Sequence, residues 1–155
     1  MDAKLVNPFI DAFISVMPQI GFPIPKRTKV YVQNKNITNF GAVVMIGFTK
    51  QIRGNVVYNM TEDTAKFIAS TMMMGMPVSE FDAMAQSAIA EMSNMLAANT
   101  ATNLTALELE VDISTPSLTV GQGSQIKISS GQYLTIEMDL GGHKVDIAIA
   151  VDRDV

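Results

Sequence analysis

A short stretch near the middle of the chain, residues 87–100, combines an acid with several amides. Its sequence is SAIAEMSNMLAANT, and it contains neither His nor Cys. Glu91 and Asn94 are three residues apart, a spacing that makes two side chains neighbours on a helix. A carboxylate and an amide can bind and orient another molecule, but neither is a strong nucleophile or base at neutral pH. From spacing alone, the same residues are also typical of an ordinary helix that faces solvent.

A helical wheel divides this stretch into two faces. Steps of four, three and four residues return to nearly the same direction, so four residues fall within about 60° of one another. These residues are Ser87, Glu91, Asn94 and Ala98. Ile89, Met92 and Leu96 fall on the opposite side. The pattern predicts a helix that buries its apolar face and presents the acid and the amide beside small residues.

The elements that would position this helix can be read from periodicity and turn residues. Apolar residues at three- and four-residue steps predict a first helix over residues 2–17, ended by Pro18, and a second one that starts near Thr61 and ends before Gly75. We expect Ser79 to cap a third helix over residues 80–104. Runs rich in Val, Ile, Tyr and Phe, or alternating apolar and polar residues, predict strands. The predicted strands cover residues 28–33, 40–50, 53–60, 107–115, 125–130, 132–140 and 144–152.

Glycines mark the expected turns between these strands. Gly41, Gly47 and Gly54 predict bends or hairpin turns in the first half, and further turns are expected at residues 121–124, 130–131 and 141–142. The order is helix, strands, two helices, strands. This order is typical of an α+β fold with helices packed on a largely antiparallel sheet, and no linker divides residues 1–155, which we take as a single domain. The two halves resemble each other loosely, without a repeat of fixed period.

The spacing of Ser87, Glu91, Asn94 and Pro116 resembles the signature of the CheC/CheX/FliY family of chemotaxis phosphatases. The chain is also similar to that family in length and element order, and LVNPFIDAFISVM resembles its opening helix. A second Glu-x-x-Asn segment, which marks the two-site members, is missing: residues 59–70 carry Glu62 but have Ala65 in place of the amide. One site per chain indicates the CheX branch.

The resemblance implies hydrolysis of the aspartyl phosphate on a CheY-like receiver domain. Asn94 would orient the attacking water, and Glu91 would dock the regulator through a Lys of the receiver. Ser87 and Ala98 would support the contact, and Pro116 would shape the strand or turn beneath the helix. The protein would need no cofactor of its own, because the receiver supplies Mg²⁺. The alternative is a non-hydrolytic adaptor that binds a receiver domain or motor protein through the same helix face.

Composition limits the other classes of function. Hydrophobic residues make up 48% of the chain and the net charge is −4, which fits a compact globule and argues against binding nucleic acid or anionic membranes. Lys26, Arg27 and Lys29 are taken as a short basic run in a loop. The absence of Cys excludes disulfides and thiolate chemistry. We expect a cytoplasmic protein that binds no membrane and, by resemblance, forms a homodimer through sheet edges.

Three other features are interpreted as structural. His143, the only histidine, is expected in a hairpin turn without a catalytic or metal-binding role. The methionines of TMMMGMP are interpreted as core-filling residues at the end of a helix, although such residues also occur on adaptable binding surfaces. GQGSQ is predicted to be a turn and not a phosphate-binding loop, because no Lys and helix follow it.

Overall fold

The structure is a computed structural model that describes residues 3–128 and 131–154. Its helices are α1 (Ala3–Gln19), α2 (Glu62–Met72) and α3 (Ala83–Thr105). Its strands are β1 (Lys26–Gln33), β2 (Ile37–Thr38), β3 (Gly41–Lys50), β4 (Ile52–Thr61), β5 (Val111–Ile113), β6 (Ser117–Val120), β7 (Gln125–Ile126), β8 (Tyr133–Asp139) and β9 (Lys144–Arg153). The elements confirm the α+β class.

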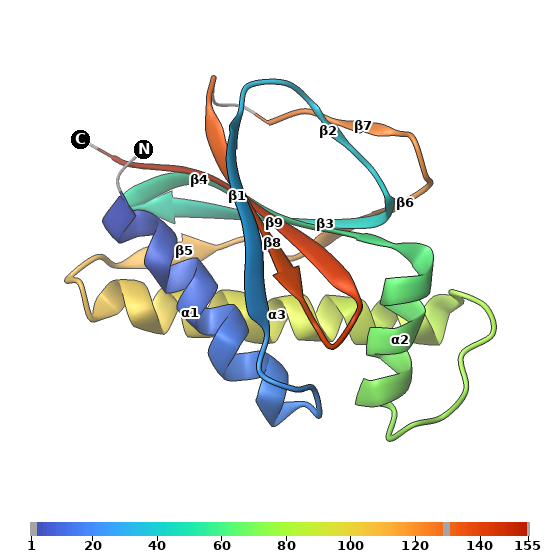
Figure 1. Ribbon diagram of the computed structural model, residues 1–155. Coiled ribbons are helices and arrows are strands. Elements are labelled where there is room, and N and C mark those ends of the chain that lie inside the picture. The colour runs from blue at the N-terminus through green and yellow to red at the C-terminus, as the bar shows by residue number, and fades with distance from the viewer. Residues whose placement is uncertain (1–2, 129–130, 155) are drawn as a thin grey trace.

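One antiparallel sheet organises the molecule. Its order is β1-β8-β9-β4-β3, and β5 and β6 both pair with the outer side of β3. Strands β2 and β7 pair with each other in a separate two-stranded sheet. Helices α1 and α3 cover one face of the main sheet, whereas the β2–β7 pair stands on the other side (Figure 1).

The two central strands are buried on both faces. In β9, Val145, Ile147 and Ile149 join the large core beneath the helices, and Ala148 and Ala150 join a smaller core on the opposite face. This alternation follows from the two-residue period of a strand. A strand covered on both sides needs apolar residues in succession, which explains why KVDIAIAVD is more apolar than an edge strand.

The order of the sheet is symmetric between the two halves of the chain. The first half runs α1, β1, β2, β3, β4 and the second runs α3, β5 with β6, β7, β8, β9. The corresponding strands are β1 and β5, β3 and β8, and β4 and β9. When each is exchanged for its counterpart, the sheet order β1-β8-β9-β4-β3-β5 reads the same in reverse, with β4 and β9 paired at the centre. Helices α1 and α3 pack against each other, and α2 lies between the halves in the sequence. The loose similarity seen in the sequence is therefore a repeat of structure.

Several predicted boundaries were wrong. Helix α1 continues through Pro18 to Gln19, and the chain then turns at Gly21, where φ is +110°. Because Pro18 has no N–H, the carbonyl of Ile14 lacks its helical hydrogen-bond donor. Ile14 is on the exposed side of the helix, where water can donate in its place. The basic residues Lys26 and Arg27 lie in strand β1 and not in a loop.

The glycines of the first hairpin do not mark its turn. Gly47 lies inside β3 and Gly54 inside β4, and the chain reverses at Lys50 and Gln51 instead. Lys50 has a φ of +88°, the left-handed conformation that a tight reversal requires. The predicted turn at residues 121–124 and the one at 141–142 are confirmed, whereas Ser130 lies outside the described residues.

The second half also has shorter elements than expected. Helix α3 begins at Ala83, and its N-cap is Asp82, whose carboxylate accepts a 3.0 Å hydrogen bond from the amide of Ala85. Ser79 therefore caps no helix. Of the predicted strands, residues 107–115 contain only β5 and residues 125–128 only β7, while residue 129 and the following one lie outside the described range. In residues 3–128 and 131–154, no helix is long and apolar enough to cross a membrane.

Candidate functional site

Helix α3 is fixed in place by its apolar face. Ile89, Met92 and Leu96 are completely buried and join the large core. On the same side, the hydroxyls of Ser93 and Thr100 donate to the carbonyls of Ile89 and Leu96, at 2.9 and 2.8 Å. Buried polar groups on this side are thus satisfied within the helix, which can pack tightly on the sheet.

The opposite face of α3 carries the residues that the sequence singled out. Ser87, Glu91, Asn94 and Ala98 are all exposed, in the arrangement that the helical wheel predicts. Glu91 is the only charged residue in α3. Within the described part of the chain, neither the Glu91 carboxylate nor the Asn94 amide has a hydrogen bond or ion pair from its side chain, so both remain available to another molecule.

The surroundings of Glu91 in the sequence are acidic. Residues 67–126 contain Glu80, Asp82, Glu91, Glu108, Glu110 and Asp112 but no Lys or Arg. An exposed carboxylate in such a stretch has no cation close by in the sequence, and a cation from a second molecule would be attracted to it. The charge pattern favours docking of a basic surface over an internal structural ion pair.

Pro116 lies between β5 and β6, at the edge of the sheet beside β3. Strand β5 pairs with one end of β3 and β6 with the other, and residues 114–116 separate them. Between them, Ser114 accepts a 2.8 Å hydrogen bond from the amide of Gly47 through its side-chain oxygen. A proline lacks an amide donor and suits such an interruption at a sheet edge. Both β5 and β6 contact α3, and Pro116 lies in the chain segment that joins them.

The topological counterpart of α3 is α1, and not the segment 59–70 in which the sequence suggested looking for a second acid–amide pair. Asn7, Asp11 and Ile14 lie exposed on α1 with the same spacing as Ser87, Glu91 and Asn94. Asp11 corresponds to the acid, but Ile14 stands in place of the amide. The acid–amide pair is complete only on α3.

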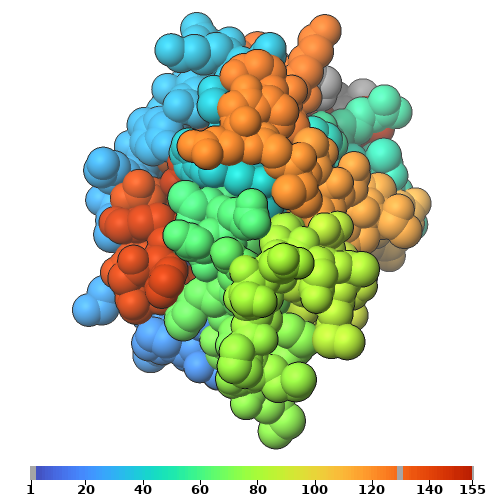
Figure 2. Space-filling model, turned by 90° about the vertical axis from the view of Figure 1, so that its right-hand side faces the viewer, coloured from blue at the N-terminus to red at the C-terminus, as the bar shows by residue number. Residues whose placement is uncertain are grey.

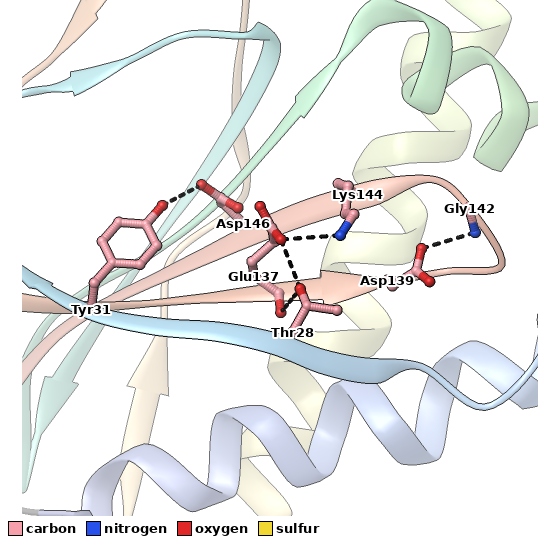
Figure 3. A network of polar contacts seen from close by, with 7 residues as sticks. All are labelled: Thr28, Tyr31, Glu137, Asp139, Gly142, Lys144 and Asp146. Carbon is pink, nitrogen blue, oxygen red and sulfur yellow. Dashed lines mark hydrogen bonds and ion pairs between the residues drawn. The ribbon is translucent and has the colours of Figure 1, made fainter.

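A second polar region lies on the sheet face away from α1 and α3 (Figure 3). The Tyr31 hydroxyl donates a 2.9 Å hydrogen bond to Asp146, which is buried, and Glu137 accepts from Thr28 and Lys144 at 2.7 and 3.1 Å. Burial raises the pKa of Asp146, while the bond from Tyr31 opposes the rise. The hydrogen bonds from Thr28 and Lys144 lower the pKa of Glu137.

This polar region extends into two hollows. A cavity of about 250 Å³ is lined by residues including Tyr31, Asn59 and Asp146, and a wider hollow of about 550 Å³ continues past Asp146 to His143. No three His, Cys, Asp or Glu side chains of the described residues gather closely enough to hold a metal ion. The network joins strands β1, β8 and β9. Local spacing in the sequence does not reveal it, because the residues of β1 lie 109 and 115 residues from their partners in β8 and β9.

His143 lies in the hairpin between β8 and β9, where the sequence predicts it. Its ring stacks on Phe67 of α2, with centroids 3.9 Å apart and planes inclined by 11°. This contact ties the hairpin to α2 and gives the histidine a packing role. The core-filling interpretation of the methionines is correct for Met72 and Met73, which pack against the core, but wrong for Met74 and Met76, which are exposed.

Comparison with known proteins identifies the kind of fold. A CheC-like superfamily protein from Shewanella sp. PV-4 matches 98% of this chain and 99% of its own, with a TM-score of 0.87 and 21% identity. A CheX from Borrelia burgdorferi, solved as a complex of CheX with CheY, BeF₃ and Mg²⁺, matches with a TM-score of 0.78 and 25% identity, and the match covers 97% of this chain and 98% of that one. The fold is that of the CheC-like proteins.

Sequence comparison narrows this class to one family. The family model described as "Chemotaxis phosphatase CheX" matches residues 42–139. A CheY-P phosphatase CheX from Thermotoga maritima is 33% identical over 127 residues, which are 82% of each chain. The chain belongs to the chemotaxis phosphatase CheX family, as the spacing of Glu91 and Asn94 led us to expect. Its enzyme class is accordingly that of a phosphatase.

Proposed function

We propose that the protein hydrolyses the aspartyl phosphate of a CheY-like receiver domain, with Asn94 orienting the attacking water and Glu91 docking the regulator. The observation that carries this proposal is the exposed acid–amide pair on α3, which has no side-chain partner within the described residues. The similarity to a CheY-P phosphatase from T. maritima and to a CheX that forms a complex with CheY supports the substrate class.

The reaction requires from the phosphatase only a group that orients the attacking water. In the reaction, the oxygen of water bonds to phosphorus while the bond from phosphorus to the aspartyl oxygen breaks, which yields inorganic phosphate and a free carboxylate. The receiver supplies Mg²⁺ and a Lys that neutralise charge on the phosphoryl oxygens. The Asn94 carbonyl can accept from the water and its NH₂ can donate, so one side chain can hold the water in line with the leaving oxygen.

Helix α3 suits this task because its inner face is held in the core and its outer face is exposed. Glu91 and Asn94 are less than one helical turn apart, so a single docking event can bring both to the same cleft of the receiver. Ser87 precedes them on that face as a supporting contact. Ala98 is small and leaves room for the rim of the partner, and Pro116 shapes the turn between β5 and β6, two strands that contact the helix.

The experiment is the decay of phosphate on a ³²P-labelled receiver from the same organism, with the wild-type protein and with Asn94→Ala. Loss of the amide should slow hydrolysis on the order of 100-fold, because a misplaced water loses the gain from orientation. Binding of the receiver should survive. Asn34→Ala, which removes an exposed amide between β1 and β2, is the matched control and should leave the rate unchanged.

Glu91→Ala tests the docking role separately. Truncation should weaken receiver binding by roughly 2 to 5 kcal/mol if the Lys of the receiver is left buried and unpaired. Full activity in Asn94→Ala would overturn the proposed mechanism. No hydrolysis by the wild-type protein with any receiver of the organism would favour the adaptor, which uses the same face for binding alone.

We further propose that residues 1–155 act as one domain in the cytoplasm, where the receiver is found, and that two copies pair through an edge of the sheet. Strand β1 supports this pairing because its outer edge has no strand partner among the described residues and it exposes 49% of Val30 and 63% of Val32. Light scattering at micromolar concentration should give the mass of a dimer, and Val32→Lys should give that of a monomer. A monomeric wild-type protein would refute the pairing.

A further inference from the structure

The segment between α2 and α3 presents methionine side chains to solvent. Met74 is 97% exposed and Met76 60%, and Met84 in the adjoining first turn of α3 is 65% exposed. The other large apolar side chains of the segment are partly or fully buried. Met74 also has a φ of +61°, a conformation that is uncommon for any residue other than Gly and somewhat strained. Large exposed methionines are typical of surfaces that bind a partner.

The segment is ordered by hydrogen bonds. The Gly75 amide donates to the carbonyl of Ser70 at 2.8 Å, and the Ser70 hydroxyl donates to the carbonyl of Met76 at 2.7 Å. The Lys66 ammonium reaches the carbonyl of Ser79 at 3.5 Å. A turn that is held in this way keeps the methionines exposed, and its backbone loses little conformational freedom when a partner covers it.

The methionines adjoin the proposed catalytic face. Met84 lies in the first turn of α3, and its direction on the helical wheel is within about 20° of that of Glu91. Met76 and Met84 line one hollow of about 220 Å³ together with Glu80 and Asp82. Figure 2 shows the α2–α3 segment and the start of α3, in green to yellow-green, side by side on one face of the molecule.

Charge indicates the chemistry of the occupant. The hollow carries Glu80 and Asp82 at its border, Glu91 follows along the helix, and residues 67–126 contain no Lys or Arg. An apolar surface with an acidic border fits a partner that has apolar side chains beside basic ones. The Lys that the proposed mechanism pairs with Glu91 would lie next to such a surface on the receiver.

We propose that Met74, Met76 and Met84 form the apolar part of the surface that docks the receiver domain, and that they set its affinity without taking part in the hydrolysis. This inference rests on the proposed function, since the receiver that Glu91 docks is the partner in question. Met84 lies about two helical turns before Glu91, and Met74 and Met76 precede the helix. The methionines are therefore away from the reacting atoms, and their contribution should be to KM and not to kcat.

The test compares wild-type protein with the triple variant Met74→Gln, Met76→Gln, Met84→Gln. The receiver that the wild-type protein binds most tightly is used, activated with beryllofluoride for binding and phosphorylated for kinetics. We expect Kd and KM to rise roughly tenfold, with kcat at saturation unchanged. Leu107→Gln removes a 43% exposed apolar side chain at the other end of α3 and should change neither constant.

The single variant Met74→Gln is the control for unfolding of the triple variant, because a side chain that is 97% exposed contributes no packing. It should also raise Kd. Unchanged Kd and KM in the triple variant would overturn the inference, and so would a fall in kcat with KM unchanged. If the wild-type protein hydrolysed no receiver phosphate, the proposed function would fail, and the binding measurements would still decide whether the methionines dock a receiver.

Discussion

Gly54 offers the sharpest test of how the central strands are packed. It lies inside β4 opposite Val151 of β9, and its φ is +141°. A Cβ atom added there would come within 1.8 Å of the carbonyl oxygen of Ala150 and 2.8 Å of the Cα of Val151. Both neighbours are backbone atoms of the strand with which β4 pairs, so a rotamer change cannot relieve the contact.

Gly54→Ala should therefore separate β4 from β9 or distort both. We expect a loss of at least about 4 kcal/mol in the free energy of unfolding, the range of exceptional single substitutions. Domains of this size are typically stable by roughly 5 to 15 kcal/mol, so the variant should be largely unfolded at moderate denaturant or fail to fold. Urea unfolding followed by far-UV circular dichroism measures the change.

Gly131→Ala is the matched control. A Cβ at Gly131 would meet nothing within 4 Å, and its φ is outside the left-handed region, so we expect a change within about 0.5 kcal/mol. A loss below about 1 kcal/mol in Gly54→Ala would show that β4 and β9 are not in the contact described here.

Two further substitutions test polar groups on either side of the sheet. Tyr58 is completely buried and its hydroxyl has no partner among the described residues, so Tyr58→Phe should raise the free energy of unfolding by about 1 kcal/mol, and destabilisation in urea would contradict this. Burial raises the pKa of Asp146, so the folded state binds its proton more tightly than the unfolded state does. Proton binding therefore stabilises the folded state at low pH, and this stabilisation is lost as the pH rises above the ordinary pKa of Asp. Asp146→Asn should therefore be stabilised relative to wild type more at pH 7 than at pH 4; equal differences in urea midpoint at both pH values would refute this assignment.

The sequence predicted the site helix well because a single period controls it. Ile89 and Asn94 fall on opposite sides of a wheel of 3.6 residues per turn, and the core beneath α3 follows the same geometry. The start of the helix was less certain for a physical reason. Ser79 and Asp82 are both good caps, and only the packing of Phe81 and Ala85 against the core decides between them.

Other features depended on contacts between distant parts of the chain. A glycine inside an apolar run can mark a turn or a close approach of two strands, and nothing near Gly54 in the sequence reveals the approach of Ala150. Tyr31 and Asp146 are 115 residues apart, so their hydrogen bond could not be predicted from local spacing. The exposure of Met74 likewise depends on the turn that follows α2.

The symmetric order of the sheet separates folding from chemistry. Duplication and fusion of a half-sized unit would produce such a sheet. Each copy would contribute one long helix and several strands of the main sheet. The inward faces of α1 and α3 must both remain apolar, because both support the same core. Ile14 and Asn94 lie on the outward faces and belong to neither core, so packing of the core does not fix the residue type at either position. One copy can therefore keep a reactive surface while the other diverges as scaffold.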